Sequence, residues 1–230
     1  MHPTPISVII PAFNASNYIK RALDSVFSQS VLPKEVIVID DGSTDNTATI
    51  VKAYGNVVSY IYQTNLGPSS ARNAGIKAAN ENIIAFLDAD DYWPKNKLET
   101  QLAILEKDTS LDVVWGRVKI DYKHEGIEKF TREGVSDDSV FITCLGAALF
   151  RKNVFNEVGL FNENLKTCED WDWYIRAMDK KVSINKIPEI GLFYCRHDDN
   201  LTKDLQDLTK QSIQLLKLTI NRRRQNTNHE

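Results

Sequence analysis

The sequence predicts an α/β protein built on a mostly parallel sheet flanked by helices. In its N-terminal half, short β-branched runs alternate with segments of helical spacing, a pattern typical of parallel strands joined by crossover helices. A length of 230 residues suits one such domain with a short appendage. Hydrophobic residues make up 42% and charged residues 26%, which excludes the disordered and fibrous classes.

Short apolar runs predict the strands of this half. They cover Ile6–Ile10, Val36–Ile39, Val58–Tyr62 and Ile83–Leu87, and a further strand is predicted at Val113–Ile120. We therefore expect a doubly wound half in which strands and helices alternate.

Helices are predicted between these strands. Apolar residues from Ile19 to Phe27 recur at helical spacing after Ser16, a candidate N-cap. The fixed φ of Pro68 suits the first turn of a later helix. The remaining helices are predicted after Thr44 or Asp45, after Pro68 and over Lys95–Leu105.

The C-terminal half is less regular. The segment Tyr122–Ser139 is polar and charged, and we interpret it as an excursion over the surface. A helix is predicted at Glu169–Met178 and a strand at Ile190–Tyr194. A polar-faced terminal helix is predicted at Leu201–Arg224.

Composition argues against several classes of protein. A formal net charge of −3 is unsuited to a protein that mainly binds nucleic acid. The three cysteines, Cys144, Cys168 and Cys195, are widely separated, which supports neither a disulfide framework nor a zinc site. The first apolar run, Ile6–Ile10, is too short to span a membrane. We therefore expect a cytoplasmic protein.

Polar motifs follow three of the predicted strands. They are Pro11–Asn14, Asp40–Ser43 and Asp88–Asp91. Ligands of open α/β sheets bind in the crevice beyond the carboxyl ends of the strands, so we expect the three motifs to line one crevice. Neither a dinucleotide fingerprint nor a phosphate-binding loop follows any of these strands. Phosphates would therefore need another neutralising group.

Asp88 and Asp90 can supply that group by holding a hard divalent cation, because closely spaced carboxylates provide oxygen ligands. An acidic turn is more often a solvated loop. Here the pair ends an apolar strand and Tyr92–Pro94 follow it, which favours a functional role.

The acidic motif after the second strand has other interpretations. Ser43, Thr44 or Asp45 could cap the following helix. That interpretation explains less well why Asp40 and Asp41 lie at the strand end. Phosphoryl-receiver domains also gather acidic residues at strand ends, although such a domain would not account for the second half of the chain.

Seven motifs occur along the chain in a fixed order. They are Val8–Asn14, Val38–Ser43, Ala71–Gly75, Phe86–Asp91, Gly159–Phe161, Glu169–Asp172 and Tyr194–His197. This set closely resembles the family 2 glycosyltransferases over nearly the whole chain except the polar excursion and the tail. The resemblance implies a Rossmann-like GT-A domain over residues 1–200 and a helical tail over 201–230. Its nucleotide-binding half would cover about 1–115 and its acceptor-side half about 116–200.

The resemblance also implies roles in binding a sugar donor. Pro11, Ala12, Phe13 and Asn14 would contact the nucleoside, Asp41 the base, Arg72 the base or diphosphate, and Asp88 the ribose or sugar. Asp90 would bind a divalent cation, Mn²⁺ or Mg²⁺. For Arg72 the alternative is a surface arginine that pairs with a nearby carboxylate. Arg196 and His197 would bind the departing diphosphate, unless they belong to a solvated loop or, for His197, to the core.

The same resemblance assigns the catalytic pair. Asp170 would be the general base and Glu169 would orient it. Without the resemblance, both would be interpreted as first-turn acids that favour the helix dipole. Trp171 and Trp173 would either stack on an acceptor sugar or belong to the core.

These assignments lead to a functional hypothesis. The chain would be an inverting, metal-dependent hexosyl- or N-acetylhexosaminyltransferase that takes its sugar from a nucleotide diphosphate donor, a UDP-sugar by resemblance. The acceptor would be a glycan or a lipid-linked sugar in surface-polysaccharide assembly. The alternative is a non-catalytic nucleotide-sugar-binding or scaffolding protein of the same fold. The terminal helix would pack on the domain, form a homodimer or rest on the inner membrane face.

Overall fold

The computed structural model describes residues 4–121, 139–197 and 205–227. Its strands are β1 (Thr4–Ala12), β2 (Pro33–Asp40), β3 (Ser59–Tyr62), β4 (Ile83–Phe86), β5 (Val113–Asp121), β6 (Ser139–Val140), β7 (Ala148–Arg151) and β8 (Ile184–Cys195). Its α-helices are α1 (Ile19–Phe27), α2 (Thr47–Lys52), α3 (Pro68–Ala78), α4 (Lys97–Lys107), α5 (Val154–Glu157), α6 (Glu169–Asp179) and α7 (Leu205–Thr227). Short 3₁₀ turns cover Gly55–Val57 and Leu145–Ala147.

Within the described part of the chain, the strands form one sheet in the order β3-β2-β1-β4-β7-β5-β6, and β8 pairs with β5. The first four strands in this order, β3, β2, β1 and β4, run parallel to one another. β7 runs antiparallel to both β4 and β5, whereas β8 runs parallel to β5. The predicted α/β class and the mostly parallel sheet are therefore confirmed.

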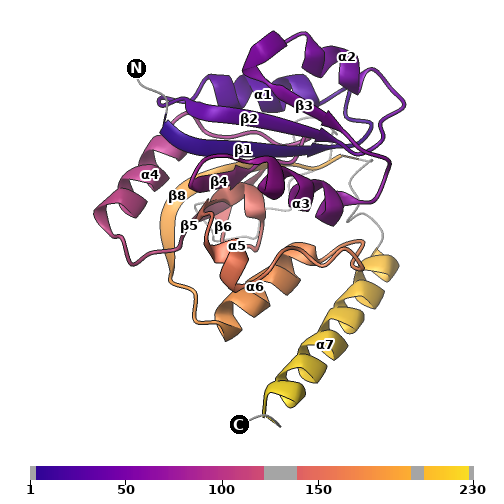
Figure 1. The fold of residues 1–230 in the computed structure, drawn as a ribbon, viewed down its shortest axis with the longest axis vertical. Coiled ribbons are helices and arrows are strands. Elements are labelled where there is room, and N and C mark those ends of the chain that lie inside the picture. Colours follow the sequence, from indigo (N-terminus) through magenta and orange to yellow (C-terminus); the bar gives the residue numbers. More distant parts are fainter. Residues whose placement is uncertain (1–3, 122–138, 198–204, 228–230) are drawn as a thin grey trace, which may run out of the picture.

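Helices cover both faces of the sheet (Figure 1). α1 and α2 contact each other, and α3 packs on β1 and β2. Pro68 is at the first position of α3, as predicted. Gly75 lets α3 approach the sheet closely, because a Cβ at this position would lie 2.3 Å from Cγ2 of Ile9. A larger residue would force helix and sheet apart.

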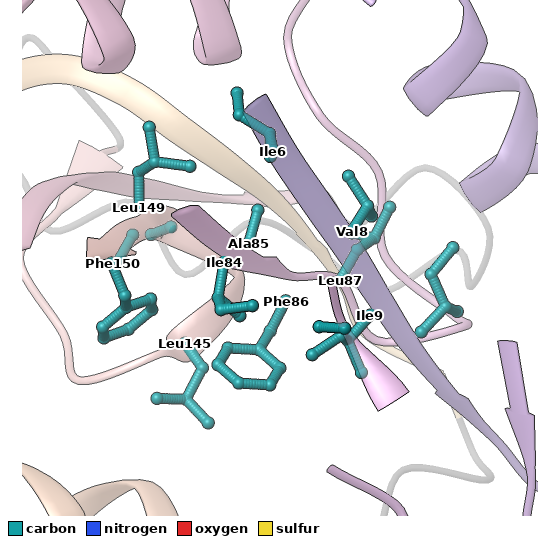
Figure 2. Close-up of a cluster of buried hydrophobic side chains, with 14 of the residues drawn as sticks. Ile6, Val8, Ile9, Ile84, Ala85, Phe86, Leu87, Leu145, Leu149 and Phe150 are labelled. Carbon is teal, nitrogen blue, oxygen red and sulfur yellow. The ribbon is translucent and has the colours of Figure 1, made fainter. Parts of the chain in front are cut away.

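The core lies along the middle strands of the sheet (Figure 2). Ile6 and Ile9 of β1, Ile84 and Phe86 of β4, and Phe150 of β7 are fully buried. Each such side chain contributes about 1.5–3 kcal/mol of burial free energy. The apolar runs in the sequence are therefore strands that are covered on both faces. Because these strands are packed in the core, the polar residues at their ends lie at a fixed edge of the sheet.

Some local predictions were wrong or incomplete. The sequence did not indicate β6, β7 or α5, because these elements are only two to four residues long. β8 begins at Ile184 and not at the predicted Ile190. The N-cap prediction for Ser16 was wrong, because α1 begins at Ile19 after Tyr18 and has no side-chain cap.

The terminal helix is present as α7 and lies beside α6 at the periphery of the molecule (Figure 1). Its predicted first residue, Leu201, lies outside the described residues, as do residues 122–138 of the predicted surface excursion. None of the helices in the described ranges has the length and apolar character needed to cross a bilayer. The predicted domain boundaries stay predictions.

Candidate active site

The carboxyl ends of β1, β2 and β4 meet at one edge of the sheet, because these strands are parallel neighbours. The backbone N–H of Asn14, after β1, donates to Oγ of Ser43, after β2, at 2.9 Å. Nη2 of Arg21 on α1 donates to the carbonyl oxygen of Asp90, after β4, at 2.7 Å. The three motifs therefore lie at one edge of the sheet, as predicted, and the crevice that they were expected to line stays a prediction.

The four predicted nucleoside contacts, Pro11–Asn14, lie at the end of β1 and in the loop after it. The Phe13 side chain is half-exposed. Asn14 has a positive φ of 47°, and its Oδ1 accepts a hydrogen bond from the N–H of Thr44 at 2.8 Å. Ala12 is buried in the core. Any contact from Ala12 to a nucleoside would therefore come from its backbone, and all four residues stay predicted contacts.

Asp41 anchors the turn that precedes α3. It is buried, and its carboxylate accepts hydrogen bonds from Nε2 of Gln63 at 2.7 Å and from the N–H groups of Leu66 and Gly67 at 2.9 and 2.8 Å. A nucleobase would have to share a carboxylate that already accepts hydrogen bonds from three N–H groups. The geometry gives Asp41 a positioning role, and its contact with a base stays a prediction.

The helix-capping interpretation holds for Asp45. Its Oδ1 accepts a hydrogen bond from the N–H of Thr47, the first residue of α2, at 2.9 Å. Its Oδ2 accepts another from the N–H of Ser16 at 2.9 Å. Burial raises the pKa of Asp45, but the hydrogen bonds from Thr47 and Ser16 outweigh this effect and lower the pKa to about 2. Asp45 therefore shapes the loops that border the site.

Arg72 connects the two halves of the molecule. Its Nη2 lies 2.6 Å from Oδ1 of Asp88 and its Nη1 lies 2.5 Å from Oε1 of Glu169. The side chain is buried, which opposes its charge, but the charges of Asp88 and Glu169 raise the pKa of Arg72 above its ordinary value. The alternative, a surface arginine that pairs with a carboxylate, was wrong about the surface, because Arg72 is buried. The expected pairing with a carboxylate is present.

Asn73 makes a second connection beside Arg72. Its Nδ2 donates to the carbonyl oxygen of Phe161 at 3.0 Å, and the N–H of Phe161 donates to its Oδ1 at 2.9 Å. The motif around Arg72 therefore holds the segment before α6, and with it the acidic pair at the start of that helix.

Asp90 and His197 lie together at the end of β4. Nε2 of His197 is 2.9 Å from Oδ2 of Asp90, and the imidazole stacks on the ring of Tyr18 with a centroid distance of 4.3 Å. Burial and then the charge of Asp88 raise the pKa of Asp90. His197 is therefore part of the site, whereas the side chain of Arg196 is exposed.

Asp91 is a buried member of the acidic cluster. Its Oδ1 accepts a hydrogen bond from the N–H of Cys195 at 2.8 Å, while its Oδ2 has no hydrogen-bond partner among the described residues. Burial and the charges of Asp90 and Asp88 raise the pKa of Asp91 well above its ordinary value. Burial first, and neighbouring carboxylates second, therefore disfavour the ionised form of Asp91.

The donor atoms around Asp90 suit a divalent cation. A carboxylate oxygen and an imidazole nitrogen converge there, and both are ordinary ligands of Mn²⁺. Over the described ranges, no group of three His, Cys, Asp or Glu side chains is arranged to hold a metal ion. Asp90 and His197 would therefore leave most coordination positions to water and phosphate oxygens, as Mg²⁺ sites at substrate phosphates do.

Glu169 and Asp170 begin α6, and the structure gives them different environments. Glu169 is buried against Arg72, whereas Asp170 is partly exposed. Burial and the charge of Glu169 raise the pKa of Asp170 to about 7, against the opposing effect of Arg72. A simple dipole interaction at a helix start would lower this pKa. The structure therefore distinguishes a buried, ion-paired Glu169 from a partly exposed Asp170, and their catalytic roles stay predictions.

The two tryptophans beside this pair point in different directions. Trp171 is 53% exposed and Trp173 is fully buried. The Trp173 ring packs on Phe150 and Phe155 in the core, and its Nε1 donates to the carbonyl oxygen of Gly159 at 3.1 Å. The predicted acceptor-binding role of Trp173 was wrong, because its ring is a core residue. Trp171 stays a predicted acceptor contact.

Sequence reasoning missed Arg21. This residue reaches Asp90 from α1, and its guanidinium lies 5.0 Å from the centroid of the Tyr92 ring. Its positive charge lowers the pKa of Asp91 against the effect of burial. The sequence carries a weak signal, because a basic residue in the first turn of a helix opposes the helix dipole and so tends to need a partner.

Comparison with known proteins gives concordant matches. A family model described as Glycosyl transferase family 2 matches residues 7–159. An uncharacterized glycosyltransferase of Rickettsia prowazekii is 36% identical over 183 residues, covering 74% of this chain and 57% of that protein. Chondroitin synthase of Pasteurella multocida is 32% identical over 97% of this chain and 24% of its own length. The crystal structure of S. aureus TarS 1-349 in complex with UDP-GlcNAc matches with a TM-score of 0.69 and 28% identity, over 85% of this chain and 59% of that chain.

Proposed function

The chain belongs to glycosyl transferase family 2 and has its GT-A fold, and from this premise we propose that it transfers a sugar from a UDP-sugar to a hydroxyl acceptor. The bridge that Arg72 forms between Asp88 and Glu169 carries the proposal. It joins the strand-end carboxylates on the donor side to the acidic pair at the start of α6. The UDP-GlcNAc bound to TarS supports a uridine donor.

Asp170 is the general base in this proposal. Its carboxylate takes the proton of the acceptor hydroxyl while that oxygen attacks the anomeric carbon from the face opposite the diphosphate. A single displacement inverts the configuration and forms no covalent enzyme intermediate. The pKa of about 7 leaves much of Asp170 ionised near neutral pH, while the Glu169 carboxylate is paired with Arg72.

Asp90 and His197 are the residues that would hold the divalent cation, Mn²⁺ or Mg²⁺. When bound, the cation offsets negative charge on the leaving diphosphate. Arg21 holds the Asp90 backbone, and Tyr18 supports the His197 ring by stacking. The chain itself therefore fixes both side chains before donor and cation arrive.

Asp90→Ala is expected to weaken binding of UDP in the presence of Mn²⁺ by at least tenfold, the order of effect that loss of a metal-site residue produces. Isothermal titration calorimetry of wild type and variant measures this, with and without a chelator. Asp108→Ala removes the same charge from an exposed residue at the end of α4 and should leave the affinity unchanged. Equal, chelator-insensitive affinities for wild type and Asp90→Ala would exclude the metal role.

Transfer is expected to increase as pH rises through about 7 and to level off above it. Below this pH the Asp170 carboxyl is protonated and cannot accept the acceptor proton, because its pKa is raised to about 7. The measurement is kcat/KM for donor consumption at saturating Mn²⁺ across this range. A rate that is flat, or that rises only near pH 4 as for an ordinary aspartate, would assign the base to another residue.

The acceptor side of the molecule supports a carbohydrate acceptor. Trp171 is exposed one residue after Asp170, where an aromatic face can stack on a sugar ring. The relation to chondroitin synthase supports polysaccharide assembly, and the UDP-GlcNAc bound to TarS supports an N-acetylhexosamine as the transferred sugar. Our proposal also includes a hexose as the transferred sugar and a glycan or lipid-linked sugar as the acceptor. A non-catalytic scaffold of the same fold is the alternative, and release of UDP from a UDP-sugar would distinguish the two.

A further inference from the structure

The C-terminal helix α7 has an inner face that is attached to α6. Leu215 and Thr219 are buried, and they share this face with Arg222 at helical spacing. Nη1 of Arg222 donates to Oδ1 of the fully buried Asp172 on α6 at 2.7 Å. α7 is therefore fixed to the helix that carries Glu169 and Asp170.

A second face of α7, turned away from the one that contacts α6, carries three exposed apolar side chains. Ile213, Leu216 and Ile220 are 50%, 59% and 41% exposed, and their i, i+3, i+7 spacing aligns them along the helix. A contiguous exposed stripe of this kind marks an interaction site more often than scattered apolar residues do. From Ile213 to Ile220 the stripe extends about 10 Å along a helix of 23 residues.

Basic residues border this stripe. Lys210, Lys217 and Arg224 are exposed on the same side of the helix, and none of them makes an ion pair with another residue in the described ranges. α7 contains five basic residues and one acidic residue, Asp207, although the chain as a whole has a net charge of −3. Arg222 and Arg223 pair with Asp172 and Asp179 of α6, so Lys210, Lys217 and Arg224 carry the positive charge that faces away from α6.

We propose that the outer face of α7 docks on an anionic lipid bilayer. Ile213, Leu216 and Ile220 would enter the boundary between headgroups and acyl chains, while the flanking lysines and arginine would contact lipid phosphates. A second copy fits this face less well, because a twofold interface would place the same basic residues opposite one another. The positive charge of this face therefore favours an anionic membrane as its partner over a second copy of the chain.

Docking would also orient the rest of the molecule. α7 lies beside α6 (Figure 1), and the Arg222–Asp172 pair holds the two helices together. Binding of α7 to a bilayer therefore brings the start of α6 near the lipid surface, where a lipid-linked acceptor would be found. The membrane contact itself does not depend on the proposed sugar transfer.

Co-sedimentation with vesicles tests the proposal. The protein is expected to pellet with vesicles of phosphatidylcholine and phosphatidylglycerol in equal parts, and to remain in the supernatant with phosphatidylcholine alone. The triple variant Lys210→Gln, Lys217→Gln, Arg224→Gln should bind roughly a hundredfold more weakly, since each basic residue near an anionic surface contributes about fivefold. The triple variant Ile213→Ser, Leu216→Ser, Ile220→Ser should lose at least about tenfold.

The matched control is Val57→Ser, which removes an equally exposed apolar side chain outside α7 and should bind vesicles like wild type. Circular dichroism checks that each variant is folded. Absence of pelleting, or equal pelleting on neutral vesicles, would overturn the proposal. So would concentration-dependent dimerisation in sedimentation velocity that the Ile213, Leu216, Ile220 variant abolishes, because the stripe would then be a contact between copies of the chain.

Discussion

Asp170→Asn is expected to lower sugar transfer by about 10²–10⁴-fold, the contribution of a positioned general base. Asparagine has nearly the same size but cannot accept the acceptor proton. The neighbouring contacts, Glu169 with Arg72 and Arg72 with Asp88, do not involve the Asp170 side chain. Binding of UDP and of the cation should therefore be retained, so that kcat falls while the donor affinity is unchanged.

The measurement is the release of UDP from a UDP-sugar in the presence of a competent acceptor, combined with calorimetry of UDP binding. Asp179→Asn makes the same change at the last residue of α6, where the carboxylate pairs with Arg223 and is remote from the cluster. This control should transfer like wild type. Wild-type turnover by Asp170→Asn would remove Asp170 from the mechanism, and loss of UDP binding would show that its role is structural.

Arg72→Met is expected to lower the free energy of unfolding by about 3–5 kcal/mol, because breaking a buried ion pair from one side leaves uncompensated buried charge. Asp88 and Glu169 both lose their cationic partner in this variant, and Glu169 is itself buried. Methionine fills a similar volume, so the effect reports the lost charge and not a cavity. Donor turnover should fall with it, since both carboxylates lose their position.

Chemical denaturation of wild type and variant measures the change in stability. Arg223→Met is the matched control, because Arg223 also pairs with an aspartate but is largely exposed, and its loss should barely change the denaturation midpoint. If Arg72→Met does not fold, Glu169→Gln provides a milder test that removes one charge from the bridge. A midpoint unchanged in both variants would mean that the Arg72 bridge does not hold the two halves together.

Much of the site follows from the sequence because parallel strands share an edge. Ile6–Ile10 and Ile83–Leu87 were predicted as strands of one parallel sheet, so the residues after them were expected at the same edge. The structure shows the two strands as parallel neighbours. The partner of Arg72 could not be derived in this way. Glu169 lies 97 positions away along the chain, in a half whose strand order the sequence pattern did not reveal.

Helical periodicity predicts different environments for the two tryptophans at the start of α6. Residues two apart on a helix lie on nearly opposite faces, so Trp171 and Trp173 cannot share one environment. Trp173 is followed at i+4 by Ala177, which is also buried, and the buried face of α6 continues through them. Helical periodicity therefore favoured one exposed and one buried ring, as the structure has them.

Strand β8 was predicted too short for a different reason. Its first half contains Asn185, Lys186, Pro188 and Glu189, which interrupt the apolar pattern. Such residues are tolerated at the edge of a sheet, and β8 pairs only with β5 among the described strands. Gly116 and Gly191 face each other where the register of this pair shifts, and a Cβ on Gly116 would lie 2.9 Å from Cα of Gly191. Pairing with β5 therefore determines this strand more than its own sequence does.

Calorimetric titration of the purified protein with UDP, first with Mn²⁺ and then with a chelator, tests the central claim most directly. The claim is that the residues at the ends of β1, β2 and β4 form a metal-dependent site for a nucleotide-sugar donor. It predicts that UDP and UDP-GlcNAc bind with Mn²⁺, that the chelator weakens both, and that other nucleoside diphosphates bind less tightly. Absence of binding by any nucleotide, or binding that the chelator leaves unchanged, would contradict it.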